Sequence, residues 1–284
     1  MGRKQTMFRA MLLNGGGGGI PSANKVLDLD PSLDVYSNVS GTTPQTTDGG
    51  SVARWNDQSS YTYAGNPLYA QQSDSSEQPL FYNSDSNRNN KPYLYFDGSD
   101  RWFTMEPYSG AYQMPEMSIY FVNQPQTPGN NGNGWMVSKT DSYYWDDGFT
   151  FVQQGDEDVS MTVADDGSDS NFFVDGAPVG NVGSIYSYTF KGAASSVDRV
   201  NAHRHKIGSA SISSRVNGTT NALDLSGWFS SQKMMICGGR DLSGNEVAYM
   251  AWVGRVYRVL VYDTCHSESE QSDIMTELST IYNI

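Results

Sequence analysis

Three aromatic side chains and two carboxylates stand side by side in the segment Tyr143-Tyr144-Trp145-Asp146-Asp147. Aromatic rings can stack on the apolar faces of sugar rings, and carboxylates accept hydrogen bonds from sugar hydroxyls. The segment therefore predicts a glycan-binding platform just before an expected strand. The alternative is that Tyr143 and Trp145 are the buried alternate residues of a strand.

Calcium is the second ligand that such residues suggest. Carboxylates together with backbone carbonyls are the oxygen ligands that calcium prefers. Asp146 and Asp147 form one candidate site, and Asp165, Asp166 and Asp169 form a second candidate loop. We expect no cofactor, and calcium is the one alternative left open.

Glycoside hydrolysis requires two carboxylates, which in retaining enzymes lie about 5–5.5 Å apart. The nearest candidate is Asp156-Glu157-Asp158, where Asp156 and Asp158 would share one strand face and Glu157 would point away. No second Glu follows in the required register. Because Gln153, Gln154 and a glycine precede this run, we interpret it as a solvated hairpin tip and predict that the protein is not an enzyme.

The three histidines do not form a convincing metal site. His203 and His205 would lie on one face of a strand, but no further ligands accompany them at metal-binding spacing. Arg204 and Lys206 alternate with them, which indicates a charged, exposed edge strand.

The two cysteines, Cys237 and Cys265, are too few for a disulfide scaffold. Two reduced, buried thiols are expected, with a single disulfide as the alternative. No segment approaches the roughly 18 apolar residues of a membrane-spanning helix. The apolar run from residue 10 to residue 13 is too short for a secretory signal peptide. We therefore expect folding in a reducing cytoplasm and no membrane partner.

The net charge of -13, from 31 acidic and 18 basic residues, argues against nucleic-acid binding. Nucleic-acid affinity depends on Lys and Arg side chains that neutralise phosphates. The acidity favours solubility, with cation binding as the alternative.

The first 25 residues differ from this acidic background. Residues 15–19 are five consecutive glycines, and we expect an N-terminal arm that docks on another subunit or a partner protein. The alternative is an arm that folds back on its own domain. The side chains expected to make this contact are Arg3, Lys4, Phe8, Arg9, Met11 and Leu12.

The rest of the chain predicts many short strands. It contains 29 Gly, 11 Pro and 18 Tyr, a composition typical of aromatic strands separated by turns. Residues 26–30, 93–96, 117–123 and 256–262 are the clearest expected strands. In residues 117–123 apolar side chains alternate with others, which predicts that one sheet face is buried. Hairpins are expected between residues 148 and 176.

A helix is expected at the C-terminus. Ser267 and Glu270 have the spacing of a capping box, in which each side chain bonds the other residue's backbone amide. The apolar residues Ile274, Met275 and Leu278 recur at helical spacing, followed by Ile281. This stripe predicts that the helix packs on the sandwich as a structural cap.

Four segments occur in an order that resembles the laminin-G-like, concanavalin A-like jelly-roll family. They are Trp55-Asn56-Asp57-Gln58-Ser59, Gln78-Pro79, Phe96-Asp97-Gly98 and Gly254-Arg255-Val256. The resemblance implies an all-β jelly-roll sandwich of two antiparallel sheets, with a short C-terminal helix, over residues 26–284. Residues 1–25 then form an extended N-terminal arm. In this family the Trp packs in the core, while the Asp and Ser fix the following loop. Residues 234–240 resemble the family's penultimate core strand.

Similar chains, without a signal peptide and with a glycine-rich arm, occur among the structural proteins of tailed bacteriophages. The resemblance thus implies a virion protein, made in the host cytoplasm, that decorates the phage head. Its expected partners are a major capsid or tail protein and further copies of itself. The alternatives are a tail-associated adhesin that binds host surface glycans, and a glycoside hydrolase.

Overall fold

The structure is a computed structural model that describes most of the chain. The described residues are 19–106, 116–126, 133–140, 148–154, 158–165, 168–174, 181–191, 202–215, 233–240, 246–247 and 252–284.

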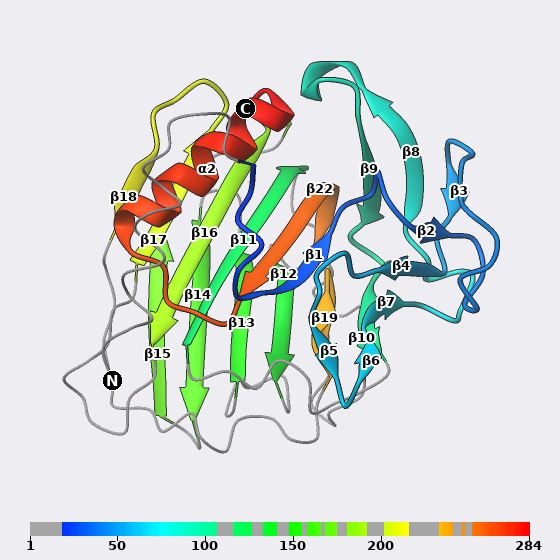
Figure 1. Ribbon diagram of the computed structural model, residues 1–284, viewed down its shortest axis with the longest axis horizontal. Helices are drawn as coiled ribbons and strands as arrows, with labels where there is room; N and C mark the ends of the chain where they lie inside the picture. Colours follow the sequence, from blue (N-terminus) through cyan, green and yellow to red (C-terminus); the bar gives the residue numbers. More distant parts are fainter. Residues whose placement is uncertain are drawn as a thin grey trace.

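Two large antiparallel sheets face each other and form a jelly-roll sandwich, as predicted (Figure 1). The first sheet follows the order β18 (Ser213–Arg215), β17 (Ala202–Ile207), β16 (Ser184–Lys191), β11 (Glu116–Pro125), β22 (Val253–Tyr262), β9 (Lys91–Asp97), β8 (Leu80–Asp85) and β3 (Gly50–Ser51). β1 (Lys25–Leu29) also joins it, paired with β22.

The second sheet closes the other side of the core. It follows the order β15 (Ser168–Val174), β14 (Asp158–Asp165), β13 (Gly148–Gln154), β12 (Asn133–Thr140), β19 (Met235–Ile236), β10 (Phe103–Glu106), β7 (Tyr69–Gln71), β4 (Arg54–Asn56) and β2 (Val35–Tyr36). Two small ribbons pair β5 (Thr62–Tyr63) with β6 (Asn66–Pro67) and β20 (Gly239–Arg240) with β21 (Glu246–Val247). A 3-10 turn, η1 (Ser86–Arg88), joins β8 to β9.

The family-like segments build the core and its turns. Trp55 on β4 is fully buried between the sheets. Asp57 accepts hydrogen bonds from the backbone N–H of Ser59 at 2.9 Å and from its hydroxyl at 2.6 Å, so the expected loop contact is confirmed. Gly254 has a φ of +148°, and a Cβ there would lie 2.5 Å from the carbonyl oxygen of Gln124. A side chain at this position would therefore collide with the neighbouring strand.

Helix α2 (Glu268–Tyr282) crosses the outer face of the first sheet (Figure 1). The capping box is confirmed: the Glu270 N–H donates to Ser267 Oγ, and the Ser267 N–H donates to Glu270 Oε2 at 2.7 Å. Ile274, Met275 and Leu278 are buried, as predicted, whereas Ile281 is half-buried. Among the described residues, no helix is both long enough and apolar enough to cross a bilayer.

The helix corrects the prediction that one face of residues 117–123 is buried. Ile119 and Phe121 pack in the core between the sheets, but Tyr120 and Val122 are buried as well, in a second cluster beneath α2. The sequence prediction missed this second buried cluster because it did not say which strands the C-terminal helix would cover.

Strand β17 is also not the exposed edge that its charges indicated. It lies between β16 and β18, and Arg204 is buried. The Arg204 guanidinium pairs with Glu268 at 2.9 Å and donates to Ser272 Oγ at 3.1 Å. The two acceptors lie on α2, so the charge on β17 serves to hold the helix.

The expected strand over residues 234–240 is interrupted. Cys237 adopts a left-handed φ of +58°, which separates β19 from β20. Neither Cys237 nor Cys265 is in a disulfide, and the first is buried and the second half-buried. Burial raises the pKa of the Cys237 thiol well above its usual value, so this side chain is an unreactive part of the core.

Candidate functional site

Most of the site residues that the sequence predicted fall outside the described part of the chain. The platform from Tyr143 to Asp147, the arm residues from Arg3 to Leu12, and Asp166 all lie there. Asp165 and Asp169 belong to the paired strands β14 and β15. Within the described residues, no three His, Cys, Asp or Glu side chains are grouped so that they could hold a metal ion.

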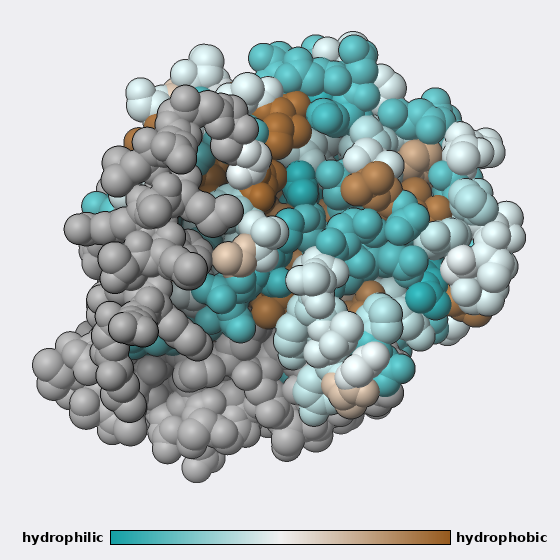
Figure 2. All heavy atoms as spheres, viewed as in Figure 1, coloured by the Kyte–Doolittle hydropathy of each residue, from teal (hydrophilic) through white to brown (hydrophobic). Residues whose placement is uncertain are grey.

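A hollow of about 320 Å³ opens between the loops around β2 and the strands β8 and β9. Its apolar surface comes from three prolines, a valine and a phenylalanine, and its polar groups are hydroxyl, amide and carboxyl side chains. The lining residues are Pro31, Ser32, Asp34, Val35, Tyr36, Pro44, Gln45, Thr46, Phe81, Asn83 and Pro92. Figure 2 shows hydrophobic and hydrophilic residues intermixed on the part of the surface over β2 and β8. This combination suits an amphipathic ligand.

A tight turn after β1 presents the first wall. The Asp30 carboxylate accepts from the Ser32 N–H at 2.9 Å and the Ser32 hydroxyl at 2.6 Å, and the Leu33 N–H donates to the Asp30 carbonyl at 3.0 Å. These bonds fold the chain back so that Asp34, with a left-handed φ of +52°, faces the hollow. Such short side-chain bonds are typical of Asp at turns.

Asp34 is fixed by its neighbours. The Tyr36 hydroxyl donates to one carboxylate oxygen at 3.2 Å, and Gln58 Nε2 donates to the other at 3.1 Å. Partial burial, followed by the nearby Asp34 charge, raises the pKa of Tyr36, so the phenol stays protonated at neutral pH. The carboxylate and the ring are thus held in place before any ligand arrives.

Gln45 and Asn83 hold the remaining lining of the hollow, in the segment beside β2 and on β8. Gln45 is buried, donates to the Ser51 carbonyl at 2.8 Å, and accepts from the Thr47 N–H at 3.0 Å. Asn83 donates from Nδ2 to the Thr46 carbonyl at 2.8 Å and to the Asp48 carboxylate at 2.9 Å. Each part of the lining therefore has a hydrogen-bonded support that does not depend on a ligand.

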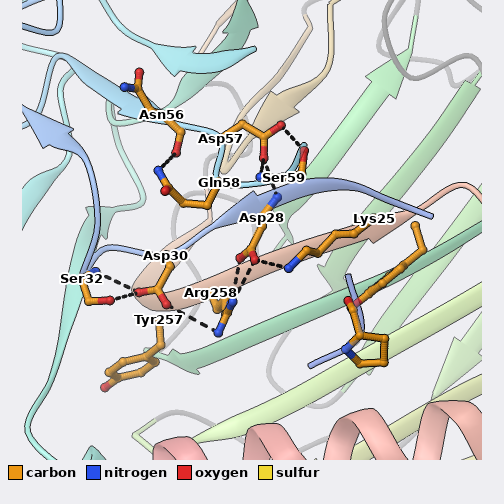
Figure 3. A network of polar contacts seen from close by, with 12 residues as sticks. Lys25, Asp28, Asp30, Ser32, Asn56, Asp57, Gln58, Ser59, Tyr257 and Arg258 are labelled. Carbon is orange, nitrogen blue, oxygen red and sulfur yellow. Dashed lines mark hydrogen bonds and ion pairs between the residues drawn. The ribbon is translucent and has the colours of Figure 1, made fainter. Parts of the chain in front are cut away.

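A buried ionic network lies behind the first wall (Figure 3). Arg258 on β22 donates two hydrogen bonds of 2.9 Å to the Asp28 carboxylate and reaches Asp30 at 3.5 Å, and Lys25 pairs with Asp28 at 2.5 Å. Burial alone would lower the pKa of Arg258, but the hydrogen bonds and charge of Asp28 outweigh it and hold the pKa above the usual range. The network ties the turn at Asp30 to the central strand.

Asp57 joins this region to the family-like segment. Its carboxylate accepts from the Asp28 N–H at 2.8 Å. Burial raises the pKa of Asp57 to about 6, although the hydrogen bonds from Ser59 and from the Asp28 backbone act in the opposite direction. Asp57 is therefore a titratable group that holds the loop carrying Gln58, and Gln58 in turn supports Asp34.

Sequence reasoning did not find the hollow, because its residues come from three separate segments, 31–36, 44–46 and 81–92. One signal was present: Asp30-Pro31-Ser32-Leu33-Asp34 has the composition of a turn that exposes its polar side chains.

No family model and no curated protein matches the chain. Several solved structures resemble it in fold. The CBM40 of the Ruminococcus gnavus IT-sialidase, bound to α2,3 sialyllactose, is 18% identical, with a TM-score of 0.42 over 57% of this chain and 83% of that one. The NanB sialidase from Streptococcus pneumoniae, as its K499G mutant, is 11% identical, with a TM-score of 0.42 over 56% of this chain.

A bacteriophage protein is among the similar structures as well. Tailspike protein 2 from the Escherichia coli O157:H7 bacteriophage CAB120 is 13% identical, with a TM-score of 0.49 over 69% of this chain. The matches cover only 23% of the NanB chain and 26% of the tailspike. These likenesses concern the fold alone.

Proposed function

We propose that this chain is a non-catalytic, glycan-binding β-sandwich whose sugar site is the hollow beside β2. The observation that carries the proposal is the hollow itself, which sets the Tyr36 ring and proline surfaces beside the polar groups of Asp34 and Asn83. Sugars offer apolar ring faces together with hydroxyls, and this lining provides a partner for both. Its volume lies at the lower end of the roughly 300–1,000 Å³ of small-molecule sites.

Binding without hydrolysis is the role that the lining supports. A glycosidase places two carboxyl groups on either side of the scissile bond. Asp34 is the one carboxylate in the lining of the hollow, and both of its oxygens already accept hydrogen bonds. We therefore expect a glycan to leave this site unchanged.

The test is glycan binding by the wild-type chain and by Tyr36→Ala and Asn83→Ala. Each variant removes a lining side chain, and we expect each to weaken the affinity for the best glycan on an array at least tenfold. Leu33→Ala is the matched control, because Leu33 is 49% exposed and does not line the hollow. Unchanged affinity in both lining variants, or release of reducing ends by the wild type, would refute the proposal.

A second candidate role is that of a virion structural protein, either a head decoration protein or a tail-associated adhesin. It is favoured by the concentration of Arg3, Lys4 and Arg9 at the start of a chain whose net charge is -13. An oppositely charged surface of a capsid or tail protein would attract such an arm.

Deletion of residues 1–18 tests this second role. We expect the truncated chain to keep the circular dichroism spectrum of the full chain, because β1 and the residues from Ile20 to Asn24 that bond or pack against the sandwich are retained, and to lose incorporation into particles. A truncated chain that is incorporated as well as the full chain would contradict docking through the arm.

A further inference from the structure

The hollow carries one formal charge, and that charge is negative. Asp34 is the only Asp, Glu, Lys or Arg among its eleven lining residues. Two more carboxylates lie outside the lining: Asp30 is paired with Arg258 at 3.5 Å, and Asp48 accepts a hydrogen bond from Asn83. The acidic group that a ligand in the hollow faces is therefore Asp34.

No Lys or Arg lines the hollow. Three cations of the surrounding elements have partners of their own. Arg258 and Lys25 both bind Asp28. Arg54 lies over the ring of Tyr69, with its Cζ 3.6 Å from the ring centroid, and its Nε donates to Asn56 at 2.7 Å. A ligand carboxylate or sulfate would thus meet no cationic side chain in the lining itself.

We infer that the hollow selects an uncharged sugar and rejects sugars that carry a carboxylate, sulfate or phosphate group. The inference rests on the proposed function and specifies its ligand. A like charge brought beside Asp34 is repelled, and it gives up water without gaining an ion pair. A neutral sugar meets no such penalty, because its hydroxyls can donate to the Asp34 carboxylate and to the amide oxygen of Asn83, whose NH₂ group is already bonded to Thr46 and Asp48.

The experiment compares matched pairs of glycans, each neutral glycan being printed beside its sialylated or sulfated counterpart. We expect the wild type to bind the neutral member at least tenfold more tightly at 0.15 M salt. The preference should shrink at 1 M salt, where the Debye length falls from about 8 Å to about 3 Å. Asp34→Asn should reduce the preference several-fold, because it removes the negative charge of the lining. Asn is the replacement because it also tolerates the left-handed backbone of this position.

Asp273→Asn is the matched control, because it removes one exposed carboxylate on α2, away from the hollow, and should leave the preference unchanged. If the wild type binds the charged member as tightly as the neutral one or more tightly, and Tyr36→Ala abolishes that binding, the inference is overturned but the hollow is still the glycan site. An unaltered preference in Asp34→Asn would also overturn it. If no glycan of either kind binds in a Tyr36-dependent way, the proposed function and the inference both fail.

Discussion

An Arg258→Ala variant is expected to lose about 3–5 kcal/mol of its free energy of unfolding. The Arg258 guanidinium makes two hydrogen bonds of 2.9 Å to Asp28, which is only 3% exposed. Alanine would leave this buried carboxylate with Lys25 as its only described cationic partner. Breaking one side of a buried pair is costly because the remaining charge stays out of water. Urea unfolding followed by tryptophan fluorescence measures the loss.

Lys191→Ala serves as the comparison, because Lys191 pairs with Glu116 at 2.8 Å and both side chains are substantially exposed. Exposed pairs contribute at most about 1 kcal/mol. Similar losses in the two variants would show that the Arg258 network does not hold the turn at Asp30.

The second large effect is a pH dependence that Asp57 introduces. Its pKa is about 6 in the folded protein and 3.8 in the absence of the fold, so the folded state binds the proton more tightly. The folded state is therefore stabilised as the pH falls from 7 towards 4, by about 3 kcal/mol as an order of magnitude. Above pH 6 the folded protein must keep a buried charge, and this stabilisation is lost.

Asp57→Asn isolates this contribution. The Asn carbonyl can keep the bonds from the Asp28 and Ser59 N–H groups, and its NH₂ can donate to the Ser59 hydroxyl. Burial lowers the pKa of His266 to about 4, which acts in the opposite direction as the pH falls, but this contribution is present in both proteins and cancels. The difference in free energy of unfolding, wild type minus variant, should increase as the pH is lowered from 7 to 4. A difference that stays constant would contradict the role of Asp57.

Part of the sandwich could be predicted from local chemistry. The capping box at Ser267 depends on two residues three positions apart. The burial of Trp55 and the Asp57 to Ser59 loop contact follow instead from the family resemblance. Gly254 could be placed in a strand from the sequence. Why a glycine is needed there is visible only in the structure, where the carbonyl of Gln124 lies too close for a side chain. Periodicity and turn residues report such short-range causes well.

Long-range packing could not be predicted in the same way. Arg204 appeared to belong to an exposed edge, yet its partners Glu268 and Ser272 lie more than 60 positions further along the chain. Tyr120 is buried because a helix from the far end of the chain covers its strand. Such contacts depend on topology, which alternation along one strand does not encode.

The candidate site shows the same limit. A run of adjacent aromatic and acidic residues, Tyr143 to Asp147, drew attention because it is local. The hollow depends instead on Asp34, Tyr36 and Asn83, which β2 and β8 bring together. Glycan binding at the first segment remains a prediction that the described structure does not test.

The measurement that tests the central claim most directly is an NMR titration of the full chain with the neutral glycan that binds best on the array. We predict that the largest amide shift changes fall on Ser32, Asp34, Tyr36, Thr46 and Asn83. These changes should saturate with one dissociation constant. Changes confined to residues 143–147, or no saturating change around the hollow, would contradict the assignment of the sugar site.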